Sequence, residues 1–203
     1  MERVIVYVDG FNLYFGIIAK RWRRYLWLDL SALAASLLRP NQTLIATKHF
    51  TALVRADNQK VQRQSTFLQA LEARGGVEIH YGRYQERLKQ CHQCHSTWPE
   101  YEEKMTDVRL ACMLVRDAYQ DAFDTCLIIS ADADLQPPVE IVKQDFPQKR
   151  VIVAFPPKRD SYHLRNIVDE HFRIGRGWLS KCQLPDQVKK PDGYVLVRPA
   201  EWK

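Results

Sequence analysis

Carboxylates that directly follow apolar runs are the residues of this sequence best suited to do chemistry. Asp9 follows the run at residues 4–8, and Asp132 and Asp134 follow residues 127–129 after two small residues. Short β-branched runs without polar alternation predict strands that are buried on both faces of a parallel sheet. Because the carboxyl ends of parallel strands meet at one edge, we expect these aspartates to lie close together.

A further carboxylate, Asp107, is predicted to lie at the start of a helix. Ala111, Leu114 and Ala118 continue a line from Asp107 at intervals of four, three and four residues, which is the spacing of one helix face. The predicted helix covers residues 103–119. Its N-terminal end must approach the same edge of the sheet as the strand-end aspartates.

Negative charges held this close raise one another's pKa unless a multivalent cation neutralises them. Oxygen ligands suit Mg²⁺ or Mn²⁺, which keep coordination positions open for phosphate oxygens. Such a cation promotes phosphodiester hydrolysis by lowering the pKa of a bound water and stabilising the leaving oxygen. An asparagine amide nearby could orient that water or a phosphate. The predicted metal-site and catalytic residues are Asp9, Asn12, Asp107, Asp132 and Asp134.

Each of these residues also has a purely structural interpretation. Asp9 could belong to a strand-end turn, and Asn12 could cap a helix. Asp132 and Asp134 could also be helix caps, and Asp107 could be a favourable first-turn acid. The combination favours the metal site, because local roles do not explain why all the aspartates fall at one predicted edge.

The chain alternates predicted strands and helices. The expected strands are residues 4–8, 44–54, 77–84, 126–129 and 151–155. One expected helix follows Asn12, and the others cover residues 30–38, 58–73, 103–119, 135–144 and 160–170. This alternation predicts an α/β, three-layer Rossmann-like sandwich with a central, mainly parallel sheet. Residues 85–99 have no clear period and are expected to form an excursion loop.

Composition favours one packed domain with a positively charged surface. The chain has 203 residues, of which 46% are hydrophobic and 27% charged, and a formal net charge of +6. This charge attracts polyanions such as nucleic acid. We expect a cytoplasmic protein with no membrane contact and with reduced thiols, since there are five cysteines and neither a signal-like start nor a membrane-length apolar segment.

Four segments carry a resemblance to a known family. They are residues 6–14, 103–111, 119–129 and 130–135, which read VYVDGFNLY, EKMTDVRLA, YQDAFDTCLII and SADADL. Over about residues 3–175 the sequence resembles the NYN domain family, in the LabA-like branch of the PIN-like nuclease superfamily. The last motif departs from the family pattern, because alanines replace its usual glycine and serine.

The resemblance implies a PIN-like fold and a metal-dependent ribonuclease that hydrolyses RNA with Mg²⁺ or Mn²⁺. It implies an acidic cluster of Asp9, Asp107, Asp132 and Asp134, with Asn12 beside it. The expected domain covers residues 1–180, and a tail at 181–203 packs on it. The alternative is a non-catalytic RNA- or protein-binding regulatory module that retains the acidic pocket. A dinucleotide-binding oxidoreductase is disfavoured, because DGFN follows the first strand where a Gly-x-Gly-x-x-Gly turn is needed.

Three basic groups are candidates for RNA contact. The stretch at residues 20–27 interleaves cations with aromatics, as single-strand binding platforms do; its alternative is a charged helix end with Trp27 in the core. Solvated surface charge is the alternative for all three groups. The predicted RNA-binding residues are Lys20, Arg21, Trp22, Arg23, Arg24, Arg55, Lys60, Arg63, Lys158 and Arg159.

A short cysteine motif in the excursion loop suggests a structural zinc site. Cys91 and Cys94 form a Cys-x2-Cys half-site, and His92 and His95 flank it. Zinc needs four ligands, so a partner chain could complete the site, and the loop or an exposed sheet edge could support a homodimer. Separately, Cys112 and Cys126 lie in predicted regular elements and are expected to be buried.

Overall fold

The computed structural model describes residues 1–55 and 57–203, without the side chains of residues 99 and 100. A six-stranded sheet has the order β3-β2-β1-β6-β7-β8, and all of its neighbouring strands are parallel. The strands are β1 (Glu2–Asp9), β2 (Gln42–Thr51), β3 (Glu78–Tyr81), β6 (Thr125–Ile129), β7 (Arg150–Phe155) and β8 (Glu170–Arg173).

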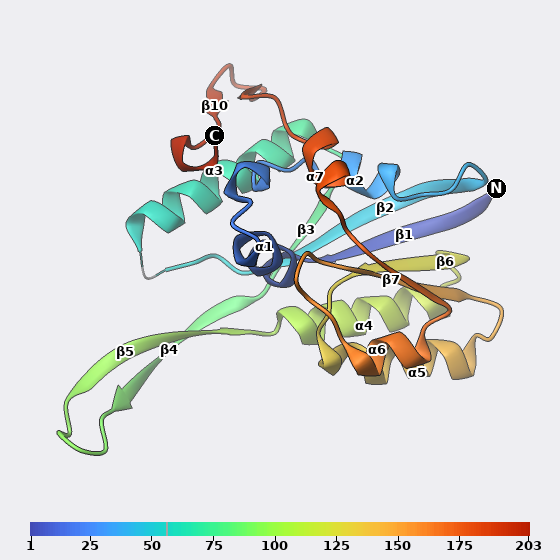
Figure 1. The fold of residues 1–203 in the computed structure, drawn as a ribbon, viewed down its shortest axis with the longest axis horizontal. Helices are drawn as coiled ribbons and strands as arrows, with labels where there is room; N and C mark the ends of the chain where they lie inside the picture. Colours follow the sequence, from blue (N-terminus) through green and yellow to red (C-terminus); the bar gives the residue numbers. More distant parts are fainter. Residues whose placement is uncertain (56) are drawn as a thin grey trace.

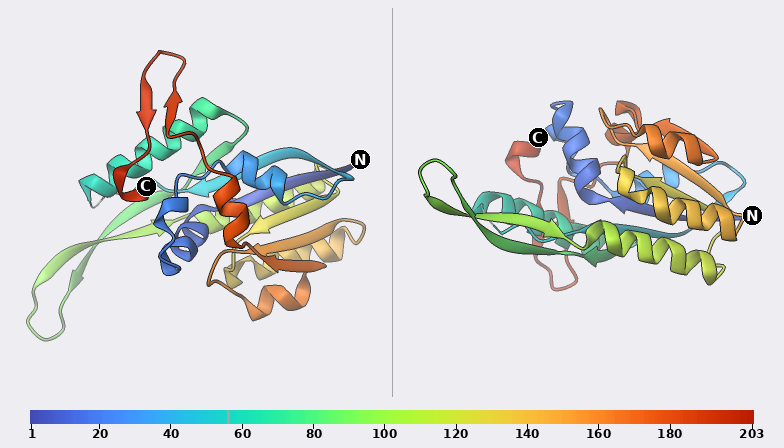
Figure 2. Two further views of the ribbon diagram at one scale, coloured as in Figure 1. Left: turned by 45° about the horizontal axis from the view of Figure 1, so that its top comes forward. Right: turned by 90° about the horizontal axis from the view of Figure 1, so that it is seen from below.

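Helices cover both faces of this sheet, which confirms the predicted three-layer α/β sandwich (Figures 1 and 2). One face carries α1 (Gly10–Ala19), α2 (Leu30–Ser36), α3 (Asn58–Arg74) and α7 (Arg176–Lys181). The other carries α4 (Thr106–Tyr119), α5 (Gln136–Asp145) and α6 (Tyr162–Ile167). No helix in the described part of the chain has the length and apolar character needed to cross a membrane.

Strand β1 contributes to both halves of the core. Val4, Val6 and Val8 pack with the α1, α2 and α3 side, while Ile5 and Tyr7 pack with the α4 and α5 side. All five side chains are buried. A strand whose two faces are both covered has no polar face, which explains the unbroken apolar run in the sequence.

The chain order places a topological switch point at the carboxyl ends of β1 and β6. From β1 the chain adds β2 and β3 on one side, and then returns to place β6 against the other side of β1. The helices that follow β1 and β6, α1 and α5, pack on opposite faces of the sheet. Ligands of open α/β sheets bind at such switch points.

A buried charged network joins β1, β2 and α4. Lys48 donates to Asp117 at 2.5 Å, and the Tyr7 hydroxyl donates to the same carboxylate at 2.7 Å. Burial alone raises the pKa of Asp117, but the hydrogen bonds from Lys48, Tyr7 and Arg116 lower it below its ordinary value. The network therefore keeps a charged pair inside the layer between α4 and the sheet.

The excursion loop predicted at residues 85–99 is a β-hairpin and not an irregular loop. This segment lies in a two-stranded antiparallel hairpin, β4 (Arg83–Gln90) and β5 (Thr97–Lys104), which projects away from the sandwich (Figure 1). Most of the described β4 side chains are exposed. A strand without a buried face needs no apolar alternation, so the sequence carries no periodic signal for it.

Several element boundaries differ from the sequence prediction. The helix predicted at 160–170 ends at Ile167, and its last residue instead begins the edge strand β8. The predicted helix start at 103 is also wrong, because β5 continues to Lys104 and Met105 adopts a left-handed turn with φ 79° before α4. Short elements at edges and turns bury few residues, so their periodicity is weak.

The last segment of the chain packs on the α3 side of the sandwich. It contains β9 (Gln187–Lys189), β10 (Val195–Val197) and a 3-10 turn, η3 (Ala200–Trp202). The ring of Trp202 lies 6.4 Å from that of Trp27 and 6.1 Å from that of Phe67, measured between centroids. These contacts place Trp202 in the same apolar cluster as α3 and β1.

Candidate metal centre

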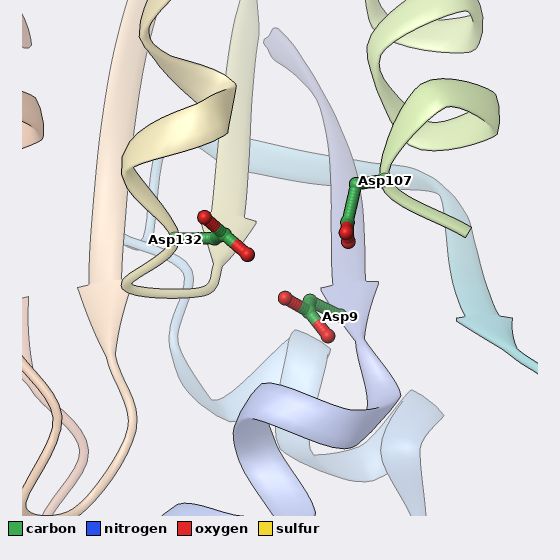
Figure 3. Close-up of side chains that lie close together, drawn as sticks. All are labelled: Asp9, Asp107 and Asp132. Carbon is green, nitrogen blue, oxygen red and sulfur yellow. The ribbon is translucent and has the colours of Figure 1, made fainter. Parts of the chain in front are cut away.

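Three aspartates from distant parts of the chain converge at the carboxyl ends of β1 and β6. Asp9 ends β1, Asp132 follows β6, and Asp107 lies in the first turn of α4; their carboxylates point into one shared space (Figure 3). One oxygen from each carboxylate lies within 4.8 Å of the chosen oxygens of the other two. We call these three residues the aspartate centre.

Asp9 is buried, and both of its carboxylate oxygens accept hydrogen bonds. Oδ1 accepts from the backbone N–H of Asn12 at 2.9 Å, which caps α1, and Oδ2 accepts from the Ser130 hydroxyl at 2.8 Å. Burial raises the pKa of Asp9 and outweighs these two hydrogen bonds, and the nearby charges of Asp132 and Glu103 raise it further. The carboxylate is therefore costly to ionise without a cation.

Asp132 is held by the loop that follows β6. Its backbone N–H donates to the Ser130 hydroxyl oxygen at 3.0 Å, so Ser130 contacts two members of the aspartate centre. Asp132 Oδ1 accepts from the backbone N–H of Asp134 at 3.0 Å and caps the 3-10 turn η2 (Ala133–Leu135). The predicted capping role is thus real, and the other carboxylate oxygen stays available for a ligand.

Asp107 is also affected by burial and by the charges around it. Burial first, and then the negative charges of Asp9, Asp132, Glu103 and Asp134, raise its pKa from 3.8 to about 7. Without a cation this carboxyl therefore keeps its proton to a higher pH than a free aspartate does. A group in this state can exchange a proton with a neighbouring water or give up its proton to a metal ion.

Glu103 is a member of the site that the sequence analysis did not single out. It lies in β5, where its carboxylate accepts hydrogen bonds from the backbone N–H of Thr106, at 3.0 Å, and from the Thr106 hydroxyl. Its charge raises the pKa of both Asp9 and Asp107. The sequence prediction counted Glu103 as the first residue of the helix, whereas the structure places it in β5, before the left-handed turn at Met105.

Two predicted residues lie beside the aspartate centre without joining it. Asp134 is exposed and is not in the group of converging oxygens. Asn12 is the third residue of α1, whose cap is Asp9, so the alternative of a helix-capping asparagine is wrong. Its side-chain oxygen accepts from the backbone N–H of Ala131 at 3.2 Å, which fastens α1 to the loop after β6.

The donor set fits a hard divalent cation. It consists of carboxylate oxygens only, which Mg²⁺, Mn²⁺ and Ca²⁺ prefer to nitrogen or sulfur. No lysine or arginine of the described residues forms an ion pair with any of the three aspartates. The described residues therefore provide no cation that pairs with these carboxylates, and a bound metal ion would stabilise all three in their ionised form.

The first predicted RNA-contact group is only partly accessible. Its cations Lys20, Arg21, Arg23 and Arg24 are exposed, but Trp27 is fully buried and Tyr25 nearly so. Tyr25 and Trp27 cannot stack on a base, so the interpretation with Trp27 in the core is the correct one for these rings. Trp22 is half-buried and packs against the core.

The other two basic groups lie near the carboxyl edge of the sheet. Lys158 and Arg159 follow β7, and Arg159 packs near Gly16 of α1. The remaining predicted cations, Arg55, Lys60 and Arg63, line a cavity between α1 and α3. Contact of either group with RNA stays a prediction.

The cysteine predictions have mixed outcomes. Cys91 and Cys94 lie at the turn of the hairpin, and all five cysteines are free thiols. Within the described residues, only the aspartate centre gathers three metal-binding side chains, so the zinc site stays a prediction. Cys126 is buried as expected, whereas the expectation for Cys112 is wrong, because it lies on the solvent side of α4.

The fold and the aspartate centre together define a PIN-like α/β sandwich with an acidic cluster at the switch point of its sheet. The chain belongs to the NYN domain family, whose model matches residues 3–175.

Two individual proteins are similar to this chain. The 6-hydroxy-3-succinoylpyridine 3-monooxygenase HspA of Pseudomonas putida is 24% identical over 240 aligned positions, which cover 98% of this chain and 75% of that protein. A crystal structure of a protein of unknown function from Vibrio parahaemolyticus has a TM-score of 0.56 at 20% identity and covers 86% of this chain and 94% of that one. The second likeness shows a shared fold.

Proposed function

We propose that this protein is a metal-dependent ribonuclease that hydrolyses RNA phosphodiester bonds at the aspartate centre. The observation that carries the proposal is the convergence of three carboxylate oxygens within 4.8 Å, without a basic partner among the described residues. Membership of the NYN family supports a nuclease-type, RNA-related function. The net charge of +6 favours a polyanionic substrate.

In this proposal Asp9, Asp107 and Asp132 hold Mg²⁺ or Mn²⁺. When bound, the cation supplies a Lewis acid that lowers the pKa of a coordinated water and stabilises the leaving oxygen. Ser130 orients Asp9 and Asp132, and Asn12 fixes the loop that carries Asp132. Asp134 lies at the rim, near enough to raise the pKa of Asp107, and could contact a second cation or the attacking water.

The test is cleavage of a labelled RNA pool in Mg²⁺, in Mn²⁺ and in EDTA. Asp132→Asn keeps the side-chain shape but removes the charge, so we expect cleavage to fall at least about a thousandfold. Asp192→Asn, an exposed aspartate in the tail, is the matched control and should cleave normally. Equal cleavage by wild type and Asp132→Asn, or cleavage that persists in EDTA, would remove the aspartate centre from the mechanism.

The alternative within the same family is a regulatory module that binds RNA or a protein without catalysis. It keeps the acidic pocket and relies on the basic surface. RNA affinity then has no dependence on the divalent cation, and Asp132→Asn binds as well as the wild type. Retained RNA binding without cleavage in either metal would favour this module over the nuclease.

One comparison favours a second candidate function, which is oxygenation of a substituted pyridine. The Pseudomonas relative is named as a monooxygenase, and the similarity extends over 98% of this chain. Incubation with 6-hydroxy-3-succinoylpyridine, oxygen and a reduced nicotinamide donor tests it directly. Oxygen uptake that depends on both the pyridine and the protein would establish this activity, and its absence would leave the ribonuclease.

The sequence also supports proposals on the domain division, the subfamily, the location, the oligomeric state and zinc binding. We propose a division into an NYN domain at residues 1–180 and a tail at 181–203, and membership of the LabA-like branch. Five free thiols suit a reducing compartment, which supports a cytoplasmic location. The native mass of the purified protein would show whether it is a homodimer. Its zinc content would show whether Cys91, Cys94, His92 and His95 bind zinc.

A further inference from the structure

A cavity of about 480 Å³ lies beside the aspartate centre but does not include it. Its walls come from α1, the end of β2, α3, the base of the hairpin and Trp202 of the tail. None of the three aspartates lines it, although Gly10 and Phe11, the two residues after Asp9, do. Its volume falls in the range of about 300 to 1,000 Å³ that small-ligand sites occupy.

The cavity and the aspartate centre lie on opposite faces of the sheet at the same edge. Successive β2 residues alternate between the faces: Lys48 and Phe50 pack toward α4, while His49 and Thr51 line the cavity. Asp9 belongs to the aspartate centre, and the next residue, Gly10, begins α1 and lines the cavity. A molecule in the cavity would therefore lie close to the aspartate centre without competing for its carboxylates.

The lining of the cavity is mainly aromatic and apolar. Tyr14 and Phe15 of α1 are 37% and 48% exposed, although they are large hydrophobic side chains. Phe67, Tyr84 and Trp202 supply further rings around the same space. Exposed aromatic side chains that border a preformed cavity are typical of sites that hold a planar ring by stacking.

The charge at this cavity is positive only. Arg55, Lys60 and Arg63 lie on its wall, and no acidic side chain among the described residues does. Arg55 is exposed and forms no ion pair within the described part of the chain, and Lys60 is 3.6 Å from Asp57 with its side chain 60% exposed. Arg55 is therefore available to an anion, and Lys60 can reach one from its long, exposed pair with Asp57, whereas Arg63 is held by Glu201 at 2.7 Å.

The inner wall is uncharged at neutral pH. Burial lowers the pKa of His49 to about 4, so its ring is neutral, and its Nδ1 is buried without a hydrogen-bond partner among the described residues. Gln64 uses its amide to bind the backbone of Val54 and Ala52, which fixes the chain just before Arg55. The cavity thus combines a neutral, ring-lined interior with a cationic mouth.

We propose that this cavity binds a planar aromatic ring that carries an anionic group, with the ring against Tyr14, Phe15 and Phe67 and the anion at Arg55 and Lys60. A nucleotide of an RNA strand and a free aromatic carboxylate share this chemistry. The proposal does not depend on the ribonuclease assignment, because binding here needs neither a metal ion nor the aspartates.

The test is calorimetric titration of the full chain in EDTA, with quenching of tryptophan fluorescence as a second readout. The probes are AMP and UMP, nicotinate and 6-hydroxynicotinate, and two half-ligands, ribose 5-phosphate and adenosine. A ring with an anion should bind at least about tenfold more tightly than either half-ligand. Tighter binding of the nucleotides identifies an RNA nucleotide as the source, and tighter binding of the pyridine carboxylates identifies a free aromatic acid.

Matched variants separate this site from general surface charge. The double variant Arg55→Gln/Lys60→Gln should weaken the anionic probes about tenfold or more and leave adenosine unchanged, and Tyr14→Ala should weaken all ring-containing probes. Lys181→Gln/Lys189→Gln removes the same charge elsewhere and should change nothing. The proposal is overturned if neither cavity variant differs from wild type, or if no ring-anion probe saturates. Loss of binding in Asp132→Asn alone would place the probes at the aspartate centre instead.

Discussion

The hydroxyl of Ser130 donates a 2.8 Å hydrogen bond to Oδ2 of Asp9, and so joins the end of β6 to the end of β1. The same oxygen accepts the backbone N–H of Asp132 at 3.0 Å. Ser130 is fully buried, so both bonds are shielded from water. One side chain thereby sets the distance between two of the three carboxylates, although it carries no charge itself.

Ser130→Ala should weaken metal binding about 10- to 100-fold, which is the usual cost of losing a group that orients a ligand. The free energy of unfolding without metal should fall by about 1 to 3 kcal/mol, because two buried partners lose their hydrogen bond. Metal affinity by calorimetry and urea unfolding measure the two effects. Ser161→Ala, which removes the α6 cap, is the control: it should destabilise the fold while metal affinity stays normal.

Asp107→Asn should stabilise the metal-free protein at pH 8 and have little effect at pH 4. The folded-state pKa is raised from 3.8 to about 7, so the folded chain holds a proton that the unfolded chain releases. Stability of the wild type in EDTA therefore falls as the pH rises through this window, with an upper bound of about 4 kcal/mol for this group. Because the pKa of Asp9 is raised as well, the stability of the Asp107→Asn variant should still fall somewhat as the pH rises.

Unfolding curves in EDTA between pH 4 and 8 measure this effect. Mg²⁺ or Mn²⁺ should stabilise the wild type at pH 8 and stabilise Asp107→Asn much less, since one ligand is lost. If the Asp107→Asn variant is less stable than the wild type at pH 8 in EDTA, the negative charge of Asp107 does not destabilise the metal-free fold.

The parts of the fold that the sequence predicted correctly are those with two covered faces or a long apolar stripe. The run at residues 4–8 has no polar position because β1 is buried on both sides, and the Leu114 face of α4 repeats at helical spacing. Both signals come from burial. The convergence of Asp9, Asp107 and Asp132 followed from the same strands and helix, because parallel strands end at one edge.

What the sequence could not predict depends on contacts between distant segments or on solvent. The hairpin at Arg83–Gln90 and Thr97–Lys104 has no buried face, so no periodicity marks it. Ser130 and Glu103 act through hydrogen bonds and charge across elements, which residue type alone does not reveal. The exposure of Cys112 could have been predicted, because helical spacing places it away from the Leu114 stripe of α4.

Lys48→Met should destabilise the protein by up to about 3 to 5 kcal/mol, because the buried Asp117 carboxylate then keeps only the more exposed Arg116 as a cation. Both side chains of this pair are less than a tenth exposed. The double variant Lys48→Met/Asp117→Leu should recover much of that loss, since no unpaired charge remains. Urea unfolding at pH 7 measures both. Lys60→Met, at an exposed pair, is the control and should cost less than about 1 kcal/mol; an equal loss in the two single variants would contradict a buried pair.

Cys94 should be the most reactive thiol of the protein at neutral pH. Hydrogen bonds from Ser96, and then from Cys91, lower its pKa to about 7, and its side chain is exposed at the hairpin turn. Burial raises the pKa of Cys126, which should stay unmodified until the chain unfolds. Mass spectrometry after brief alkylation at pH 7 identifies the modified residue.

The same alkylation tests the predicted zinc site at this turn. If Cys91 and Cys94 bind zinc with an adjacent histidine, added zinc should slow modification of Cys94 and EDTA should restore it, because a coordinated thiolate is shielded from the reagent. Cys94→Ser should remove the fast phase, and Cys112→Ser, at an exposed helix position, should retain it. A fast phase that zinc leaves unchanged would refute zinc binding at the turn, while the low pKa of Cys94 would still account for its reactivity.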